Sequence, residues 1–291
     1  MNSAALFRIG NTGWADGEQW GGVMYGAAIS DELLVPADFV LPFTPVEPNP
    51  PVGTLLHYDF TANSGTTVTD LSGQGNDGTL VGFADTSAGA GQFGASEGWV
   101  DGGGLSFLDD ADRSYVETPL PLNALENKDF TVEYTANYSG AEDWTPAIAS
   151  DDLPIFFFGI DSGQTGNEVN VPGGGGGTIG TQPWTAPDPT EHHLAVTYER
   201  ETGELEVFVD GVPMGTSWRG ASMTTENLFR IANSGWAEGE QWAGVITGIA
   251  ISDMKLGPSD FVLAPIPEPA TLTLLLLGCL AGLGGWRCRR R

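Results

Sequence analysis

The sequence is poor in basic residues. Of 291 residues, 11 are Lys or Arg and 38 are Asp or Glu, which gives a formal net charge of −27 at pH 7. Four of the arginines stand among the last five residues, so only seven basic groups serve the rest of the chain. Such a surface repels phosphate groups, and this excludes nucleic acid as a partner. The acidity is compatible with export and with divalent cations, and a role in solubility alone also accounts for it.

Cysteine is almost absent. Cys279 and Cys288, the only two, lie in the last 13 residues, so the body of the protein has no disulfide whatever its compartment. Long helical patterns are also missing from the body, whereas Gly (42) and Pro (19) are frequent. Short apolar runs separated by turn residues predict an all-β sandwich of two sheets over residues 54–263.

The clearest strand pattern lies in residues 191–215. Apolar residues alternate with polar ones on both sides of a turn at Thr202-Gly203, and a second turn follows at Asp210-Gly211. This period-two pattern predicts a three-stranded antiparallel meander with one buried face. The buried positions of its first two strands are Leu194, Val196, Tyr198, Leu205, Val207 and Val209. A second sheet must cover this apolar face, because an isolated hairpin is marginal in water.

Further strand-sized patterns occupy residues 55–60, 130–138, 155–160, 228–231 and 244–251. Residues 173–177 are five consecutive glycines, which have no side chain to pack, so we predict a mobile loop there.

Two motifs carry a family resemblance. Residues 192–215, HHLAVTYERETGELEVFVDGVPMG, resemble the central hairpin of laminin G-like domains, which have a concanavalin A-like jelly-roll fold. Residues 70–78, DLSGQGNDG, resemble the loop between the first two strands of the same family. The resemblance covers most of residues 54–263. It implies a jelly roll of two antiparallel sheets and a module that binds carbohydrate or protein.

The 70–78 loop contains candidate metal ligands. Asp70, Asn76 and Asp77 offer hard oxygen atoms, and Ca²⁺ takes carboxylate and carbonyl oxygens. Alternatively, these side chains bond their own backbone in Asx-turns, which is favoured because the loop lacks a fixed ladder of ligands. Ca²⁺ is the one cofactor that the sequence indicates.

Three tryptophans are candidate ligand-binding residues, because they lie in or beside loops rich in Gly, Asp and Asn: Trp144, Trp184 and Trp218. A flat aromatic face with amides and carboxylates nearby suits a sugar. For each of them, packing against the body is the alternative. For Trp236 and Trp242 we favour packing.

We expect no catalytic activity, although concanavalin A-like folds include glucanases. Those enzymes need two carboxylates that flank the scissile bond. Glu204 and Glu206 have a suitable i, i+2 spacing but lie outside the Glu-x-Asp-x-x-Glu pattern of the related glucanases. His192 and His193 lack a third metal ligand. The favoured function is therefore a non-catalytic surface or matrix protein that binds an extracellular polysaccharide or a surface protein. The alternative is a polysaccharide-active glycoside hydrolase of the same fold.

The C-terminus is organised as a sorting signal. A Pro267-Glu268-Pro269 triplet precedes an apolar run over residues 270–286, and arginines follow at the end. This order resembles the PEP-CTERM tail of exported Gram-negative proteins. It implies processing by an exosortase and a final place in the cell envelope or outside the cell. The apolar run has about the minimum length for a helix that crosses a bilayer. The terminal residues Arg287, Arg289, Arg290 and Arg291 would keep that end in the cytoplasm. An ordinary membrane anchor is the alternative.

Part of the domain sequence occurs twice. Residues 6–41 match residues 228–263 at a constant offset of 222, with 25 identities in 36 positions, which indicates a duplication. We therefore predict four parts. Residues 1–41 are the C-terminal fragment of an upstream laminin G-like repeat, whose front we expect to lie before Met1. Residues 42–53 are a Pro-rich linker, 54–263 the laminin G-like domain, and 264–291 the sorting tail with a hydrophobic helix.

Overall fold

The computed structural model describes residues 51–61, 64–108, 114–140, 144–161, 163, 165–235 and 240–263. The chain divides into two units, Met1–Asn49 and Pro50–Arg291, and all the described residues belong to the second. The expected repeat fragment and C-terminal hydrophobic helix lie outside the described residues, and the domain boundaries stay a prediction. Within these ranges, no helix has the length and hydrophobicity needed to cross a membrane.

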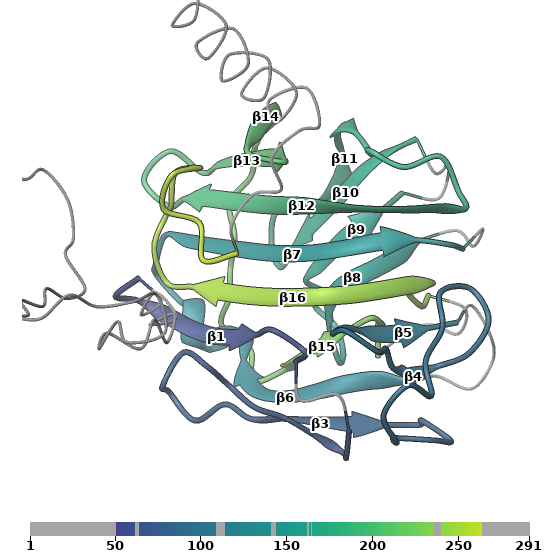
Figure 1. Cartoon of the computed structure of the whole chain (residues 1–291). Coiled ribbons are helices and arrows are strands. Elements are labelled where there is room, and N and C mark those ends of the chain that lie inside the picture. The colour runs from purple at the N-terminus through teal and green to yellow at the C-terminus, as the bar shows by residue number, and fades with distance from the viewer. Residues whose placement is uncertain are drawn as a thin grey trace, which may run out of the picture. The chain divides into compact units, whose positions relative to one another are not determined.

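Two antiparallel sheets, each of eight strands in the described ranges, form the body (Figure 1). The first sheet contains β14 (Val212–Trp218), β13 (Glu204–Val209), β12 (Asp188–Glu199), β7 (Phe130–Tyr138), β16 (Gly244–Ser252), β5 (Leu105–Phe107) and β4 (Gly98–Trp99), with β1 (Thr54–Tyr58) paired to β16. The second contains β11 (Gly175–Thr181), β10 (Gly166–Val171), β9 (Phe157–Ile160), β8 (Thr145–Ser150), β15 (Leu228–Ile231), β6 (Tyr115–Pro121), β3 (Gly78–Val81) and β2 (Thr67–Val68). One 3-10 turn, Leu122–Leu125, follows β6. The chain passes between the sheets as in a jelly roll, and the predicted fold class is confirmed.

The predicted meander is also confirmed. β12 and β13 pair antiparallel, from Leu194 opposite Val209 to Glu199 opposite Glu204, and β14 continues beside β13. The six apolar positions expected to be buried all belong to the core between the sheets. The alternation within each strand therefore supplies the core on one side and leaves the other side for separate uses.

Aromatic rings from different parts of the chain fill the centre of this core. The ring centroid of Trp242 lies 5.7 Å from that of Tyr134, 5.5 Å from that of Tyr138 and 5.6 Å from that of Trp184. Phe158, from the second sheet, meets Tyr134 edge to face at 4.9 Å. Edge-to-face contacts of this kind are the favoured geometry for buried rings. Trp242 is thus a packing residue, as the sequence favoured.

The glycine run departs from the prediction. Gly175, Gly176 and Gly177 are the first residues of β11 and pair with β10, so the expectation of a loop was wrong for these three positions. A Cβ at Gly176 would overlap the side-chain amide of Asn170, and one at Gly177 would lie 2.8 Å from the guanidinium of Arg219. Close neighbours account for glycine here, and the strand is held by backbone hydrogen bonds to β10.

Two buried tyrosines differ in whether the hydroxyl group has a hydrogen-bond partner, and this difference predicts different effects on the free energy of unfolding. The Tyr58 hydroxyl donates to the carbonyl oxygen of Asn76 at 2.6 Å. The Tyr134 hydroxyl is buried and has no hydrogen-bond partner among the described residues. We expect Tyr134→Phe to leave the free energy of unfolding unchanged or to raise it by up to about 1 kcal/mol, because a buried polar group without a partner is removed. Tyr58→Phe, the same chemical change, should lower it by about 1–2 kcal/mol. Denaturant unfolding of both variants measures the difference, and equal losses would contradict the assignment.

Candidate functional site

Polar and aromatic residues gather on the outer face of the second sheet, where β9, β10 and β11 lie side by side. Phe158, Val169 and Ile179 point into the core, so the intervening residues of each strand face outward. The strand register places Asn170 opposite Phe157, and Glu168 opposite Thr178. The sequence alone did not single out these outward positions.

Two carboxylates meet at one hydroxyl on this face. The Oγ1 atom of Thr178 lies 3.1 Å from Oδ2 of Asp161 and 3.4 Å from Oε2 of Glu168. Asp161 follows β9 directly and also accepts hydrogen bonds from the backbone N–H of Thr165 at 2.7 Å and from its hydroxyl at 3.1 Å. A hydroxyl has one hydrogen, so Thr178 donates to one of the two carboxylates at a time.

Their surroundings shift the pKa values of the two carboxyl groups, Asp161 and Glu168, in opposite directions. Burial alone would raise the pKa of Asp161, but hydrogen bonds from Thr165, Gly166 and Thr178 outweigh it and hold that pKa below its ordinary value. Burial raises the pKa of Glu168 above its ordinary value, against the attraction of Arg219 and the hydrogen bond from Thr178. Pairs of titratable groups whose pKa values are shifted in opposite directions occur at functional sites and also in structural networks.

Trp144 lies on the other side of β9 from β10 and β11. It immediately precedes β8, has a left-handed backbone with φ of 61°, and packs edge-on against Phe157 with 6.1 Å between ring centroids. The residue is 38% exposed. Part of Trp144 is therefore open to solvent next to Phe157, the residue that lies opposite Asn170. We call the set Trp144, Phe157, Asp161, Glu168, Asn170 and Thr178 the β9–β11 surface.

The three tryptophans predicted to bind ligand do not come together. Trp184 is 3% exposed, contacts Tyr138 and Trp242, and donates its indole N–H to the carbonyl oxygen of Thr190 at 2.9 Å. Its ring faces are thus occupied by the core. Trp218 is 69% exposed at the end of β14, on the first sheet, whereas Trp144 packs on the second. Of the three, Trp144 is the one on the second sheet, and a role in binding stays a prediction for each.

The loop with the predicted metal ligands is held by its own hydrogen bonds. Oδ1 of Asp70 accepts the backbone N–H groups of His57 at 2.9 Å and Ser72 at 3.0 Å. Oδ2 accepts the hydroxyl of Ser72 at 2.7 Å and the backbone N–H of Asn76 at 2.9 Å. Asp77 accepts the backbone N–H of Asp70 at 2.8 Å.

These contacts leave Asp70 little capacity for a cation. A carboxylate has about four lone-pair positions, and here four donors occupy them. The side chain of Asn76 is directed to the carbonyl oxygen of Leu55, to which its amide donates at 2.7 Å. In the described ranges, no three His, Cys, Asp or Glu side chains are grouped to hold a metal ion. Ca²⁺ binding therefore stays a prediction, and the local geometry agrees with the Asx-turn alternative.

The other candidates of the sequence lie on the first sheet. Glu204 and Glu206 are on β13 and face away from the core, with Glu204 opposite Trp218. His192 Nδ1 is 2.6 Å from Asp210, and His193 Nε2 is 3.0 Å from Glu133. Each histidine thus has a carboxylate partner, far in the fold from the β9–β11 surface.

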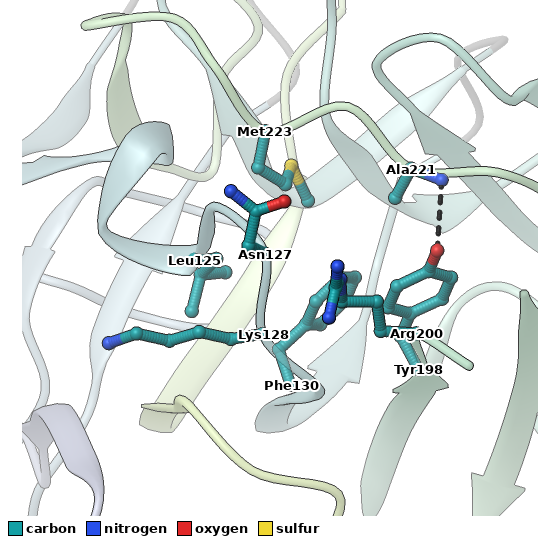
Figure 2. A pocket seen from close by; sticks show the side chains of 8 residues that line it. All are labelled: Leu125, Asn127, Lys128, Phe130, Tyr198, Arg200, Ala221 and Met223. Atoms are coloured by element: carbon teal, nitrogen blue, oxygen red, sulfur yellow. Dashed lines mark hydrogen bonds between the residues drawn. The ribbon is translucent and has the colours of Figure 1, made fainter.

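A small pocket lies between the 3-10 turn, the start of β7 and the end of β12 (Figure 2). Its space is about 40 Å³, and its lining residues are Leu125, Asn127, Lys128, Phe130, Tyr198, Arg200, Ala221 and Met223. The Tyr198 hydroxyl accepts the backbone N–H of Ala221 at 3.1 Å beside it. Ligand pockets are usually of about 300–1,000 Å³, so this one has room for water but not for a sugar ring.

The two antiparallel sheets define a jelly-roll β-sandwich. Residues 110–260, more than half of the chain, match the family model described as the concanavalin A-like lectin/glucanases superfamily. The chain therefore belongs to this superfamily, and the predicted resemblance is confirmed. Residues 265–291 match the PEP-CTERM protein-sorting motif.

Solved structures show the same fold at low sequence identity. Domain 4 of AbnA, a GH43 extracellular arabinanase from Geobacillus stearothermophilus solved in complex with arabinotriose, is 18% identical with a TM-score of 0.52. The match covers 73% of this chain and 98% of that domain. The sialidase of Trypanosoma rangeli in complex with sialic acid is 16% identical with a TM-score of 0.51, and the match covers 73% of this chain but 32% of the sialidase. No curated protein sequence matches the chain significantly.

The bonds of Asp70 generate a prediction about pH. Burial alone would raise the pKa of Asp70, but hydrogen bonds from Ser72, Asn76 and His57 hold it below its ordinary value. Its stabilising contribution is thus complete above the unfolded-state pKa of about 4 and is lost as the pH falls through the lower folded-state pKa. We expect Asp70→Asn to lower the free energy of unfolding by about 1–3 kcal/mol at neutral pH, with a deficit that shrinks below about pH 4.

Unfolding curves as a function of pH measure this deficit. The exposed Asp101 provides the control, since Asp101→Asn removes the same charge from the acidic chain. A deficit that is equal for the two variants, or that grows at low pH for Asp70→Asn, would contradict the role of these hydrogen bonds.

Proposed function

We propose that this chain is a non-catalytic exported module that binds carbohydrate through the β9–β11 surface. The proposal depends on one arrangement: the partly exposed Trp144 packs against Phe157, Asn170 lies opposite Phe157 on the next strand, and Thr178 is exposed on the strand beyond it. An aromatic face can stack on the apolar face of a sugar ring, while an amide and a hydroxyl can bond its hydroxyl groups. No deep pocket is needed, because a polysaccharide can lie along an open face.

The comparisons support a polysaccharide partner in a general way. The arabinanase domain, which shares the fold, was solved with a bound arabinotriose. At 18% identity this agreement extends to the fold, and the type of sugar bound by the present chain is open. A surface protein is the second partner that the sequence indicated.

The sorting motif supports a place outside the cytoplasm. A PEP-CTERM motif at residues 265–291 favours export in a Gram-negative bacterium, membrane attachment before processing, and recognition by an exosortase-type enzyme. The processed protein would lie in the cell envelope or the extracellular matrix. The net charge of −27 suits such a place, since it keeps an exported protein soluble.

A second function has one specific observation in its favour. Retaining glycosidases hold two carboxyl groups about 5–5.5 Å apart, and Asp161 and Glu168 both lie within hydrogen-bonding reach of Thr178. The raised pKa of Glu168 and the lowered pKa of Asp161 would suit an acid and a nucleophile. We rank this function second, because Glu168 is nearly covered and Asp161 already accepts several hydrogen bonds.

Carbohydrate binding is tested by two matched tryptophan substitutions. We expect Trp144→Ala to weaken binding of the preferred oligosaccharide about tenfold or more, through loss of the stacking surface. Trp218→Ala, which removes an even more exposed indole from the other sheet, should leave the affinity unchanged. A glycan array that includes arabinotriose selects the sugar, and titration calorimetry with and without Ca²⁺ gives the affinities. Equal losses in both variants, or an array without signal, would argue against the β9–β11 surface as a sugar site.

Measurements of polysaccharide hydrolysis test whether the chain is a binding module, as proposed, or a hydrolase. We expect the wild-type chain and Glu168→Gln to release no reducing sugar from arabinan or β-glucan above a buffer blank. Turnover that disappears in Glu168→Gln would establish the hydrolase instead. Turnover that disappears only in a Glu204→Gln/Glu206→Gln double variant would place the chemistry on the first sheet.

A further inference from the structure

Residues 253–263, which we call the clamp, follow β16 and return across the outer face of the first sheet (Figure 1). Leu256 and Phe261 of the clamp are almost fully buried and form an apolar cluster with Ala195 and Phe208 of the sheet. The Phe261 ring lies 5.4 Å from that of Phe208 and 5.2 Å from that of His193. The clamp is therefore packed as part of the domain.

A buried carboxylate holds the last residues of the clamp. Glu133 points outward from β7 and is 0% exposed beneath the clamp. Its Oε1 accepts the backbone N–H of Val262 at 3.1 Å, and its Oε2 accepts that of Leu263 at 3.1 Å. His193 Nε2 lies 3.0 Å from Oε2. Each oxygen of the side chain thus accepts one of two successive backbone N–H groups, so Glu133 acts as a latch on these two amides.

A second side chain of β7 holds the beginning of the clamp. The Thr131 hydroxyl donates to the carbonyl oxygen of Met254 at 2.8 Å and accepts the backbone N–H of Leu256 at 2.9 Å. Lys128 adds an ion pair to Asp253 at 2.6 Å. Both ends of the clamp are thus tied to the same strand.

The duplication in the sequence shows to which part of the protein the clamp belongs. The clamp ends in Asp-Phe-Val-Leu at residues 260–263, and the same four residues end the first copy at 38–41. A Pro-rich stretch follows the first copy, whereas the sorting motif follows the second. The clamp sequence is therefore a property of the domain and is independent of the tail.

The clamp ends where the sorting motif begins. The motif starts at residue 265, and the last backbone hydrogen bond to Glu133 is made by Leu263. Enzymes that process peptides commonly bind them as extended strands with free backbone groups. We propose that the clamp gates processing of this protein. An exosortase-type enzyme can bind the segment that precedes the motif only when residues 253–263 detach from the sheet. Glu133 is the positioning residue that sets how often they detach. The proposal depends on the sorting motif and is independent of carbohydrate binding.

Hydrogen exchange on the intact chain tests the latch. We expect exchange at the amides of Val262 and Leu263 to become about tenfold faster or more in Glu133→Gln, because the two N–H groups use different oxygens of Glu133 and the NH2 group that replaces one of them cannot accept. The remaining core amides should keep their protection. Glu206→Gln is the control, since it makes the same chemical change on the same face of the sheet without removing a bond to the clamp. Unchanged exchange at Val262 and Leu263 would overturn the latch.

Processing in cells tests the gate. Pulse–chase labelling in a Gram-negative host that sorts PEP-CTERM proteins should show Glu133→Gln converted to the mature form several-fold faster than the wild type and Glu206→Gln. If Glu133→Gln fails to fold, Thr131→Val releases the other end of the clamp and should give the same acceleration. Faster amide exchange with an unchanged or slower rate of processing would overturn the gate while leaving the proposed sugar site unaffected.

Discussion

The structure depends on the burial of alternate side chains between its two sheets. Each sheet alone would expose a continuous apolar face, and together they enclose rings such as Tyr134, Phe158 and Trp242. Because inner positions serve packing, the chemistry of the domain is confined to outer positions and loops. This division explains why Trp184, although it lies in a loop, serves the core, whereas Trp144 keeps an open surface.

The two outer faces are used differently. The first sheet covers part of its outer face with the clamp, which buries Glu133 and His193 under Phe261. On the second sheet, the β9–β11 end carries the partly exposed Trp144 on Phe157 and two almost covered carboxyl groups that meet at Thr178. One face thus holds the last described residues of the domain, and we propose that the other binds a ligand.

Sequence patterns predicted the fold well where side chains alternate. Residues 130–138 and the meander form strands with the expected faces, since period two directly reflects the pleat. The glycine run was misjudged because glycine carries no such pattern; three of its residues pair with β10 and lie close to Asn170 and Arg219. The association of Asp161, Glu168 and Thr178 could not be predicted, because it depends on the register of three strands. Glu133 has the same property, since its partners lie about 130 residues away.

The positions of the last two strands bear on the timing of folding. β15 lies between β8 and β6, and β16 lies between β7 and β5 while also pairing with β1. Both sheets therefore lack a central strand until residues 228–252 have been synthesised. Folding from the N-terminus during synthesis, the usual order for growing chains, cannot close either sheet. The two sheets can therefore be completed only when nearly all of the domain has been synthesised.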